Sequence, residues 1–268
     1  MRLQRIVVTN DDGIDAPGLA VAEAIAHQLA DEVWTFAPAL DQSGMAQALS
    51  MHQPLRIVPH GARRFSVSGT PADCVMAALA DDPDGLRMGG QAPDLVLSGV
   101  NWGANLSDSV MYSGTVGAAL AAAHFGLPAV ALSQLFTQRD HIDFAPAQAH
   151  AATTIEHLWT QRETLGCCWN INFPMRAPAD IAGLRFVRQV GGSMQRPSLV
   201  SRSDGRGMEY HWLSFTRNWD AIVDAAADVT AIRDARVAVM PLMRERCDET
   251  RLSGAGVCSE FDWPGAGD

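Results

Sequence analysis

The sequence predicts an α/β protein: a Rossmann-like three-layer core around a mainly parallel sheet, plus an extended β-hairpin arm towards the C-terminus. Three observations predict this fold. Short apolar runs, such as residues 6–8, 95–97 and 129–132, have the composition of strands that are buried on both faces. These runs alternate with longer segments of helical character. From residue 184 onward, strand-like runs separated by glycine-containing turns replace the alternation.

Caps and helix breakers set the predicted boundaries. Pro17 occupies the first turn of a helix, Pro38 ends the second strand, and Thr70 precedes Pro71 as an N-cap. Asp73 then lies in a first helical turn, where its charge complements the helix dipole, so we predict a structural role for it. Helices are predicted over residues 17–30, from 71 onward, and over 144–161 and 220–232; strands over 32–37, 54–58, 64–67, 95–97, 129–132, 169–173 and 236–240; and a surface loop over 81–92.

Two adjacent carboxylates, Asp11 and Asp12, follow the first strand in the sequence NDDG. In doubly wound sheets, ligands bind at the carboxyl ends of the strands. A carboxylate pair at that edge can hold a hard cation such as Mg²⁺ or Mn²⁺. The alternative is an Asx-type turn in which one aspartate caps the next helix. These residues alone leave both interpretations open.

Two other polar segments are predicted to lie near the same edge. Ser43 follows the second strand, and a doubly wound topology places this loop beside Asp11 and Asp12. Ser113, Gly114 and Thr115 begin a helix of small residues after a connection much longer than usual. A helix start offers backbone N–H groups and a positive dipole end to an anion. The simpler interpretation is that Ser113 only caps the helix.

Charge and composition exclude several classes of function. The formal net charge is −10, which argues against a nucleic-acid polymer as the main partner. The chain contains no lysine, and all 20 basic residues are arginine. This excludes a Walker P-loop and Schiff-base chemistry. The first turn also lacks the GxGxxG pattern of a dinucleotide site. Any phosphate chemistry must therefore use a metal, arginine or backbone amides.

The sequence also suggests a cellular setting. Five cysteines without a CxxC motif fit a reducing compartment, and Cys167 and Cys168 are predicted to pack in the core. No apolar run reaches the roughly 20 residues that a membrane span needs. The chain enters a strand at once, without a segment of signal-peptide character. We therefore expect a cytoplasmic protein without a membrane partner.

The chain is predicted to form one structural domain with three parts. Residues 1–183 form the α/β core, residues 184–243 form a hairpin arm that returns to the core, and residues 244–268 form a flexible tail. Tyr210, Trp212 and Trp219 could pack across a partner subunit, so the arm predicts a homodimer or homotetramer. Alternatively, Arg202 and Arg206 could reach a negative group of a substrate.

Several ordered motifs occur at compatible spacings between residues 5 and 242. They are NDDGIDAPGL (10–19), APALDQSG (37–44), PLRI (54–57), GTPADCV (69–75), PDLVLSGVNWGANL (93–106), YSGTVGAA (112–119) and NINFP (170–174). Together they resemble the survival protein E (SurE) family of metal-dependent nucleoside monophosphate phosphatases.

The resemblance implies a site as well as an activity. One divalent metal ion per subunit, Mg²⁺ or Mn²⁺, would be held by side chains that offer hard oxygen ligands. The metal ligands implied are Asp11, Asp12, Ser43 and Asn101, with Asp11, Asp12 and Asn101 also catalytic. The residues implied to bind substrate phosphate are Asn10, Gly44, Asn105, Ser113, Gly114 and Thr115. Asp12 is the first candidate for a general base, and Asn10 is expected to support the aspartates from behind.

The function predicted is hydrolysis of nucleoside 5′- and 3′-monophosphates to nucleoside and phosphate, with short-chain polyphosphate as a further substrate. Two alternatives stay open. One is a non-catalytic nucleotide- or phosphate-binding regulator, and the other is a phosphatase for non-nucleotide esters. An open metal position favours an enzyme, because a pure binder has no need of one.

Overall fold

The structure, a computed structural model, describes residues 2–81, 88, 91–136, 142–162 and 168–243. The predicted tail (244–268), Cys167 and most of the predicted loop 81–92 lie outside this range. The helices are α1 (Pro17–Leu29), α2 (Pro71–Leu79), α3 (Gly114–His124), α4 (Ala145–Thr160) and α6 (Asp228–Arg233), with short 3-10 helices η1 (Ser107–Tyr112), η2 (Pro178–Asp180) and η3 (Trp219–Ala221). The strands are β1 (Leu3–Thr9), β2 (Ala30–Pro38), β3 (Ile57–Gly61), β4 (Arg64–Val67), β5 (Leu95–Trp102), β6 (Ala129–Gln134), β7 (Cys168–Phe173), β8 (Leu184–Phe186), β9 (Ser198–Ser203), β10 (Glu209–Ser214) and β11 (Val237–Pro241).

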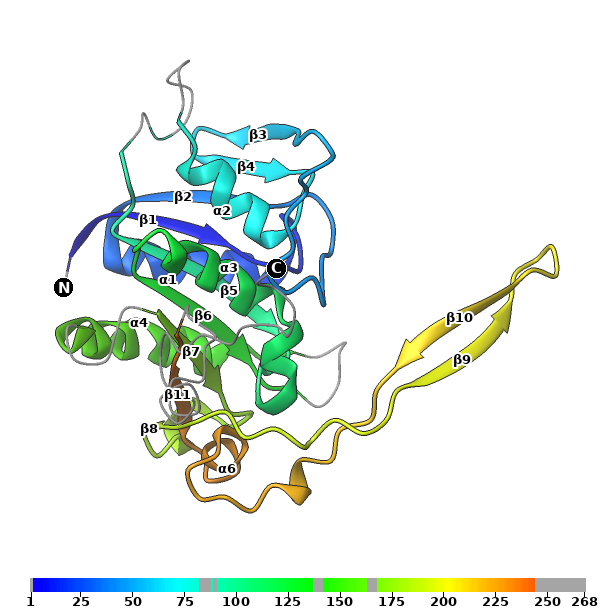
Figure 1. The fold of residues 1–268 in the computed structure, drawn as a ribbon. Helices are drawn as coiled ribbons and strands as arrows, with labels where there is room; N and C mark the ends of the chain where they lie inside the picture. The colour runs from blue at the N-terminus through cyan, green and yellow to red at the C-terminus, as the bar shows by residue number, and fades with distance from the viewer. Residues whose placement is uncertain (1, 82–87, 89–90, 137–141, 163–167, 244–268) are drawn as a thin grey trace, which may run out of the picture.

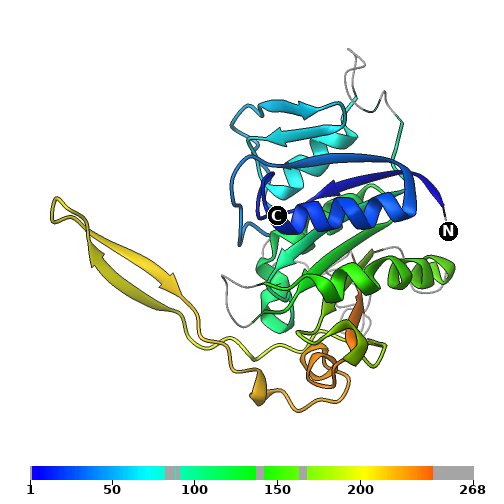
Figure 2. The ribbon, with the colours of Figure 1, turned by 180° about the vertical axis from the view of Figure 1, so that it is seen from behind.

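The core is a nine-stranded sheet in the order β3-β4-β2-β1-β5-β6-β7-β11-β8. Its central strands pair in parallel, and among the described strands of this sheet antiparallel pairing occurs only between β3 and β4 and between β11 and β7. Helices cover both faces, with α1 and α4 on one side and α2, α3 and α6 on the other (Figures 1 and 2). The predicted three-layer α/β fold is therefore confirmed.

Alternate side chains of each strand pack on opposite faces of the sheet and belong to different parts of the core. In β1, Ile6 and Val8 pack towards α1 and α4, whereas Val7 packs towards α2 and α3, and all three are fully buried. This two-residue period explains the unbroken apolar runs of the sequence, because both faces of each strand are covered.

Most predicted boundaries are confirmed within a few residues. Thr70 forms a capping box with Asp73, in which the Thr70 hydroxyl accepts from Asp73 N and the Asp73 carboxylate accepts from Thr70 N. The structural role predicted for Asp73 is therefore confirmed. Cys168 is buried in the core, as predicted. The predicted helix over 220–232 is wrong at its start, because only η3 and α6 are helical there.

β5 is longer than predicted and irregular. Its register with β6 shifts between Ser98 and Asn101. Gly99 has φ +135°, and a Cβ at this position would lie 2.3 Å from the Leu132 carbonyl oxygen, so only glycine fits. The irregularity lies directly before Asn101, at the carboxyl end of the strand.

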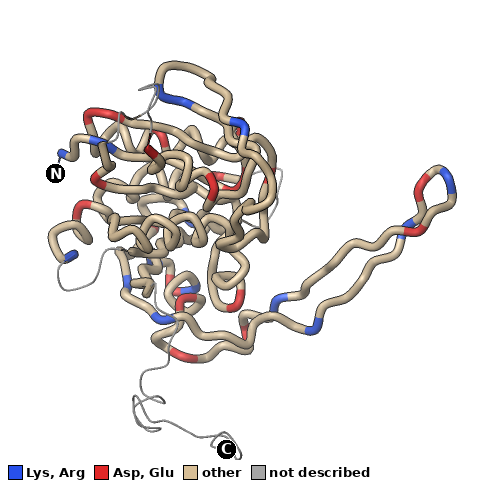
Figure 3. Tube along the Cα trace, turned by 45° about the horizontal axis from the view of Figure 1, so that its top comes forward, with Lys and Arg blue, Asp and Glu red and all other residues tan. Residues whose placement is uncertain are grey.

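β9 and β10 form a two-stranded antiparallel hairpin that projects away from the core (Figures 1 and 2). β8 and β11, by contrast, belong to the main sheet. The projecting part is therefore shorter than the predicted segment 184–243. Charged residues lie near the tip and the base of the hairpin, and the strand centres carry none (Figure 3).

Candidate active site

The strand order creates a switch point beside β1. The chain passes from β1 to β2 on one side and later returns to β5 on the other side. The loops after β1 and β5 therefore separate at this point, as in other doubly wound sheets that bind ligands there. Asp11 and Asp12 follow β1, and Asn101 lies at the end of β5. Their convergence is a consequence of this topology.

Asp11 is a buried carboxylate, with only 4% of its surface exposed. Its Oδ1 accepts a 2.6 Å hydrogen bond from the Thr115 hydroxyl. Burial raises the pKa of Asp11 above its ordinary value, against the lowering effect of the bonds from Thr115. No arginine or histidine forms an ion pair with Asp11 within the described part of the chain. The site thus holds a buried acid without a protein counter-charge.

The start of α3 packs directly against Asp11. A Cβ on Gly114 would lie 2.8 Å from the Cβ of Asp11 and 2.9 Å from its Oδ2, so a larger residue would collide with the carboxylate. Ser113 caps the helix by accepting a hydrogen bond from Val116 N, so the predicted cap is confirmed, and the phosphate-binding role implied for Ser113 stays a prediction. Ser113 also lines the cavity described below, where its hydroxyl hydrogen is still available as a donor.

Two predicted substrate-binding residues have other roles in the structure. Thr115 is fully buried and donates its hydroxyl to Asp11, so it supports the carboxylate. Asn10 is also fully buried, and its side chain donates to Gly13 O and accepts from Gly13 N. Asn10 therefore shapes the turn that carries the aspartates. Both side chains are fully buried, and neither lines the cavity described below.

The other predicted residues gather around one cavity of about 890 Å³. Asp11, Ser43, Gly44, Asn101, Asn105 and Ser113 line it on the core side. Asp12 adjoins it through a 3.4 Å contact between Trp102 N and Asp12 Oδ2. The loop of Ser43 is fixed beside Asp11, because Gln42 N donates to Asp11 O. Sequence reasoning thus predicted most of one wall of the cavity.

Ser43 and Asn101 present oxygen atoms to this cavity. The Ser43 hydroxyl donates to Asp41 Oδ1 at 2.6 Å, so its oxygen lone pairs are available to accept. The Asn101 side-chain nitrogen donates to Gly103 O at 2.8 Å, which leaves the amide oxygen as the possible ligand atom. No group of three or more histidine, cysteine, aspartate or glutamate side chains suited to a metal occurs among the described residues. A metal here would depend on hydroxyl and amide oxygens in addition to the aspartates.

Asn105 is held by a polar network that sequence reasoning missed. Its backbone N donates to Asn172 Oδ1, and its carbonyl accepts from the side chains of Asn170 and Asn172. Its own side-chain nitrogen donates to Ser133 Oγ at 2.8 Å. The sequence WNINF (169–173) contains a signal for this network. Its two asparagines alternate and therefore lie on one face of a buried strand, where they need polar partners.

The opposite wall comes from the arm. Met194, Leu213, Phe215, Arg217 and Trp219 line the cavity together with the core residues. Arg217 also donates from Nε to Ser109 Oγ at 3.0 Å. Of the two arginines considered as substrate contacts, Arg202 lies on β9 and Arg206 in the hairpin turn, and neither lines the cavity. Within the described part of the chain, the arginine that lines the cavity is Arg217.

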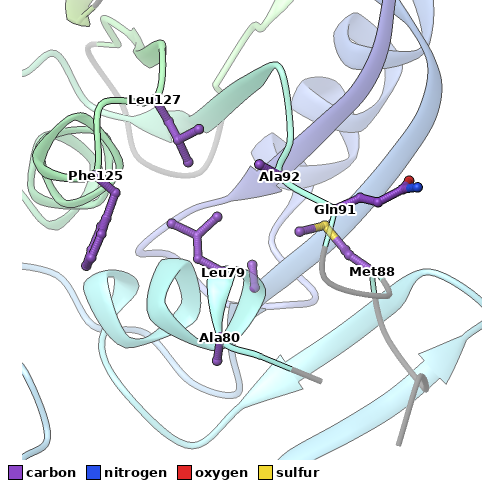
Figure 4. A pocket seen from close by; sticks show the side chains of 8 residues that line it. Leu79, Ala80, Met88, Gln91, Ala92, Phe125 and Leu127 are labelled. Carbon is purple, nitrogen blue, oxygen red and sulfur yellow. The ribbon is translucent and has the colours of Figure 1, made fainter. Parts of the chain in front are cut away.

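A second cavity, of about 220 Å³, lies near the C-termini of α2 and α3 (Figure 4). Leu79, Met88, Phe125 and Leu127 line it, and Gln91 is the only polar side chain of its described lining. None of these described lining residues has an ionisable side chain.

Comparison with known proteins agrees with this geometry. The family described as Survival protein SurE matches residues 6–196. The chain belongs to the SurE family. A protein named 5′-nucleotidase SurE 1 from Burkholderia lata is 45% identical over 93% of this chain and 94% of its own length. 5′-nucleotidase SurE from Azorhizobium caulinodans is 40% identical over 93% and 96%.

The fold comparison gives the same result. The crystal structure of the SurE protein from Aquifex aeolicus matches with a TM-score of 0.76 and 26% identity, covering 93% of this chain and 97% of that one. The described residues contain no helix of sufficient length and apolarity to span a bilayer.

Proposed function

We propose that this SurE-family chain is a metal-dependent phosphomonoesterase that hydrolyses nucleoside 5′- and 3′-monophosphates, with short polyphosphate as a further substrate. The observation that carries the proposal is the buried Asp11 carboxylate, which lies beside the start of α3 on a cavity large enough for a nucleotide. The names of the relatives, 5′-nucleotidase SurE, support the same substrate class.

The donor set fits one Mg²⁺ or Mn²⁺ ion. Asp11, Asp12, Ser43 and Asn101 offer hard oxygen ligands, which these cations prefer. Burial makes the Asp11 carboxylate costly to ionise, and a cation would supply the missing counter-charge. When bound, the ion would stabilise negative charge on the phosphoryl oxygens and make a water molecule more acidic.

The chain's own residues perform the remaining tasks. Thr115 holds Asp11 in one orientation and favours its ionised form. Ser113, at the N-terminus of α3, can donate its hydroxyl to a phosphate oxygen, and the helix dipole favours the anion there. Trp102, Tyr112, Phe136, Phe215 and Trp219 line the cavity and offer ring faces to a nucleobase. We propose Asp12 as the general base.

The test is phosphate release from AMP. Protein stripped with EDTA should be inactive, should recover activity with Mn²⁺ or Mg²⁺, and should lose it in Asp12→Asn. Metal and AMP binding without turnover would support a binding regulator instead. Faster hydrolysis of sugar phosphates than of AMP would indicate a phosphatase for non-nucleotide esters.

We also propose that the arm joins subunits into a homodimer or homotetramer. Leu199, Tyr210, Trp212 and Leu213 are 64%, 43%, 64% and 60% exposed, and such apolar surface favours burial by a partner. Light scattering of the intact chain should give a mass of at least two subunits. We further propose a cytoplasmic location, supported by the free thiols of Cys74 and Cys168, and cell fractionation would test it.

A further inference from the structure

A phosphate monoester needs positive charge around it, and this chain has no lysine to provide it. Of the described residues that line the 890 Å³ cavity, Arg217 is the only one with a cationic side chain. We infer that Arg217, at the base of the arm, binds the phosphate group of the substrate. This inference rests on the proposed phosphatase function and adds a binding residue outside the sequence motifs that carry the family resemblance.

The backbone of Arg217 is fixed by pairing within the arm base, which we define as residues 192–195 and 216–218. Arg217 forms an antiparallel bridge with Met194. On either side of it, Asn218 N donates to Ser193 O at 2.7 Å and Gln195 N donates to Thr216 O at 2.9 Å. Arg217 therefore lies on a short ladder and not on a free loop.

Asp108 attaches the arm base to the core. Its carboxylate accepts from Gly192 N, from the Ser193 hydroxyl at 3.1 Å and from Met194 N at 2.7 Å. Burial opposes ionisation of Asp108, but these hydrogen bonds outweigh it and hold its pKa below the usual range. Asp108 lies on η1, which leads directly into the Ser113 cap of α3. The arm base is thus positioned relative to the start of α3.

The Nε atom of Arg217 is held by a hydrogen bond, and its terminal N–H groups are available to bind a ligand. Nε donates to Ser109 Oγ at 3.0 Å, and Ser109 is buried. No carboxylate of the described residues forms an ion pair with this guanidinium. Its terminal N–H groups form the planar fork that binds phosphate oxygens in pairs. A fixed arginine without an acidic partner, on an otherwise uncharged cavity wall, is complementary to a dianion.

The test compares Arg217→Gln and Arg217→Lys with wild-type protein and with Arg202→Gln as a matched control. Arg202 lies on the same arm but outside the cavity. We expect Arg217→Gln to raise the KM for AMP and the inhibition constant of inorganic phosphate by about 10- to 100-fold. Arg217→Lys should fall between it and wild type, because the charge remains and the fork is lost. Inhibition by adenosine, which has no phosphate, should change less than about twofold, since the lost interaction is with phosphate.

Equal weakening of adenosine and phosphate would overturn the inference, because it would mean that Arg217 only positions the arm. An unchanged phosphate inhibition constant in Arg217→Gln would overturn it as well. Calorimetric titration of the Mn²⁺-loaded protein with inorganic phosphate measures the same interaction without turnover. If the wild type bound phosphate but did not hydrolyse AMP, the proposed function would fail while the role of Arg217 would still be measured.

Discussion

The two walls of the cavity are built in different ways. On the core wall, Asp11, Asn105 and Ser113 are buried. Asp11 and Asn105 form hydrogen bonds with Thr115 of α3 and Asn172 of β7, and Ser113 caps α3. On the arm wall, Leu213, Phe215 and Arg217 are exposed on a segment whose two strands pair only with each other among the described strands. The core wall is thus prepared to bind before a ligand arrives, whereas the arm wall depends on the few contacts at the arm base. Chemistry should therefore be sensitive to the core, and substrate binding to the arm.

The largest effect should come from Asp11→Asn. Loss of the buried negative charge removes the centre of the proposed metal site, so the turnover of AMP should fall by about 1,000-fold or more. The thermal midpoint should fall little or rise, because the pKa of Asp11 shows that its charge is costly to bury. Asp31→Asn, on an exposed ion pair with Arg2, is the matched control and should keep full activity. Turnover within tenfold of wild type in Asp11→Asn would mean that the reaction does not depend on this carboxylate.

Gly114→Ala should give the next largest effect. The added Cβ would lie 2.8 Å from the Cβ of Asp11, so the start of α3 must move away from the carboxylate. We expect about a 100-fold loss in turnover, together with about 1–3 kcal/mol of destabilisation typical of overpacking. Gly205→Ala, in the hairpin turn outside the cavity, where nothing lies within 4 Å of the added Cβ, is the matched control. If the two variants behaved alike, the close approach of Gly114 to Asp11 would not be the cause of the loss.

Removal of the hairpin tests whether it is needed for folding of the core or for association of subunits. Replacing residues 197–214 with Gly-Gly should leave the core folded, because β9 and β10 are not part of the nine-stranded sheet. Light scattering should then report a smaller assembly than wild type, and the KM for AMP should rise more than the turnover number falls. An unfolded product by circular dichroism would show that the core depends on the arm for stability.

Asp108→Asn tests the attachment of the arm base to the core, through the pH dependence of the unfolding free energy. The folded-state pKa of Asp108 lies below its unfolded value, so its ionised form stabilises the fold. That contribution is fully present above the unfolded pKa of about 3.9 and is lost as pH falls through the lower folded value. At pH 7 we expect Asp108→Asn to lose about 1 kcal/mol of unfolding free energy, since the carboxylate is only partly shielded from water.

The check is denaturant unfolding of both proteins between pH 3 and 7. The difference between wild type and Asp108→Asn should stay constant above about pH 5 and shrink towards pH 3. A difference that grew as pH fell would contradict the assigned direction of the pKa shift.

The smallest effect should come from Ser201→Ala. The Ser201 hydroxyl and His211 Nδ1 lie 2.9 Å apart across the exposed hairpin, so the pair competes with water. We expect a change in unfolding free energy within about 0.5 kcal/mol and unchanged kinetics. A loss above about 1 kcal/mol would indicate that a partner covers this pair in solution, which would support the proposed subunit contact.

The sequence by itself determined the local features of this protein. Unbroken apolar runs predicted strands with both faces covered, and Pro17, Thr70, Pro71 and Ser113 predicted where helices begin. These features are readable because a strand's period and a helix cap depend on residues within a few positions of each other. The placement of Asp11, Ser43 and Asn101 on one edge followed from parallel strand order, which restricts loop positions strongly.

Only the tertiary structure decided which neighbours these residues have. Three contacts join residues between 67 and 108 positions apart: Asn105 with Asn172, Arg217 with Ser109, and Gly114 with Asp11. The same limit applies to Thr115 and Asn10, which the resemblance implied as phosphate-binding residues, although Asn10 was also expected to support the aspartates. Their residue types suit a phosphate site, but whether a side chain points into the cavity or behind the carboxylate depends on packing between elements. That packing is set by the whole sheet and by the close approach of helices to it, and no local pattern encodes it.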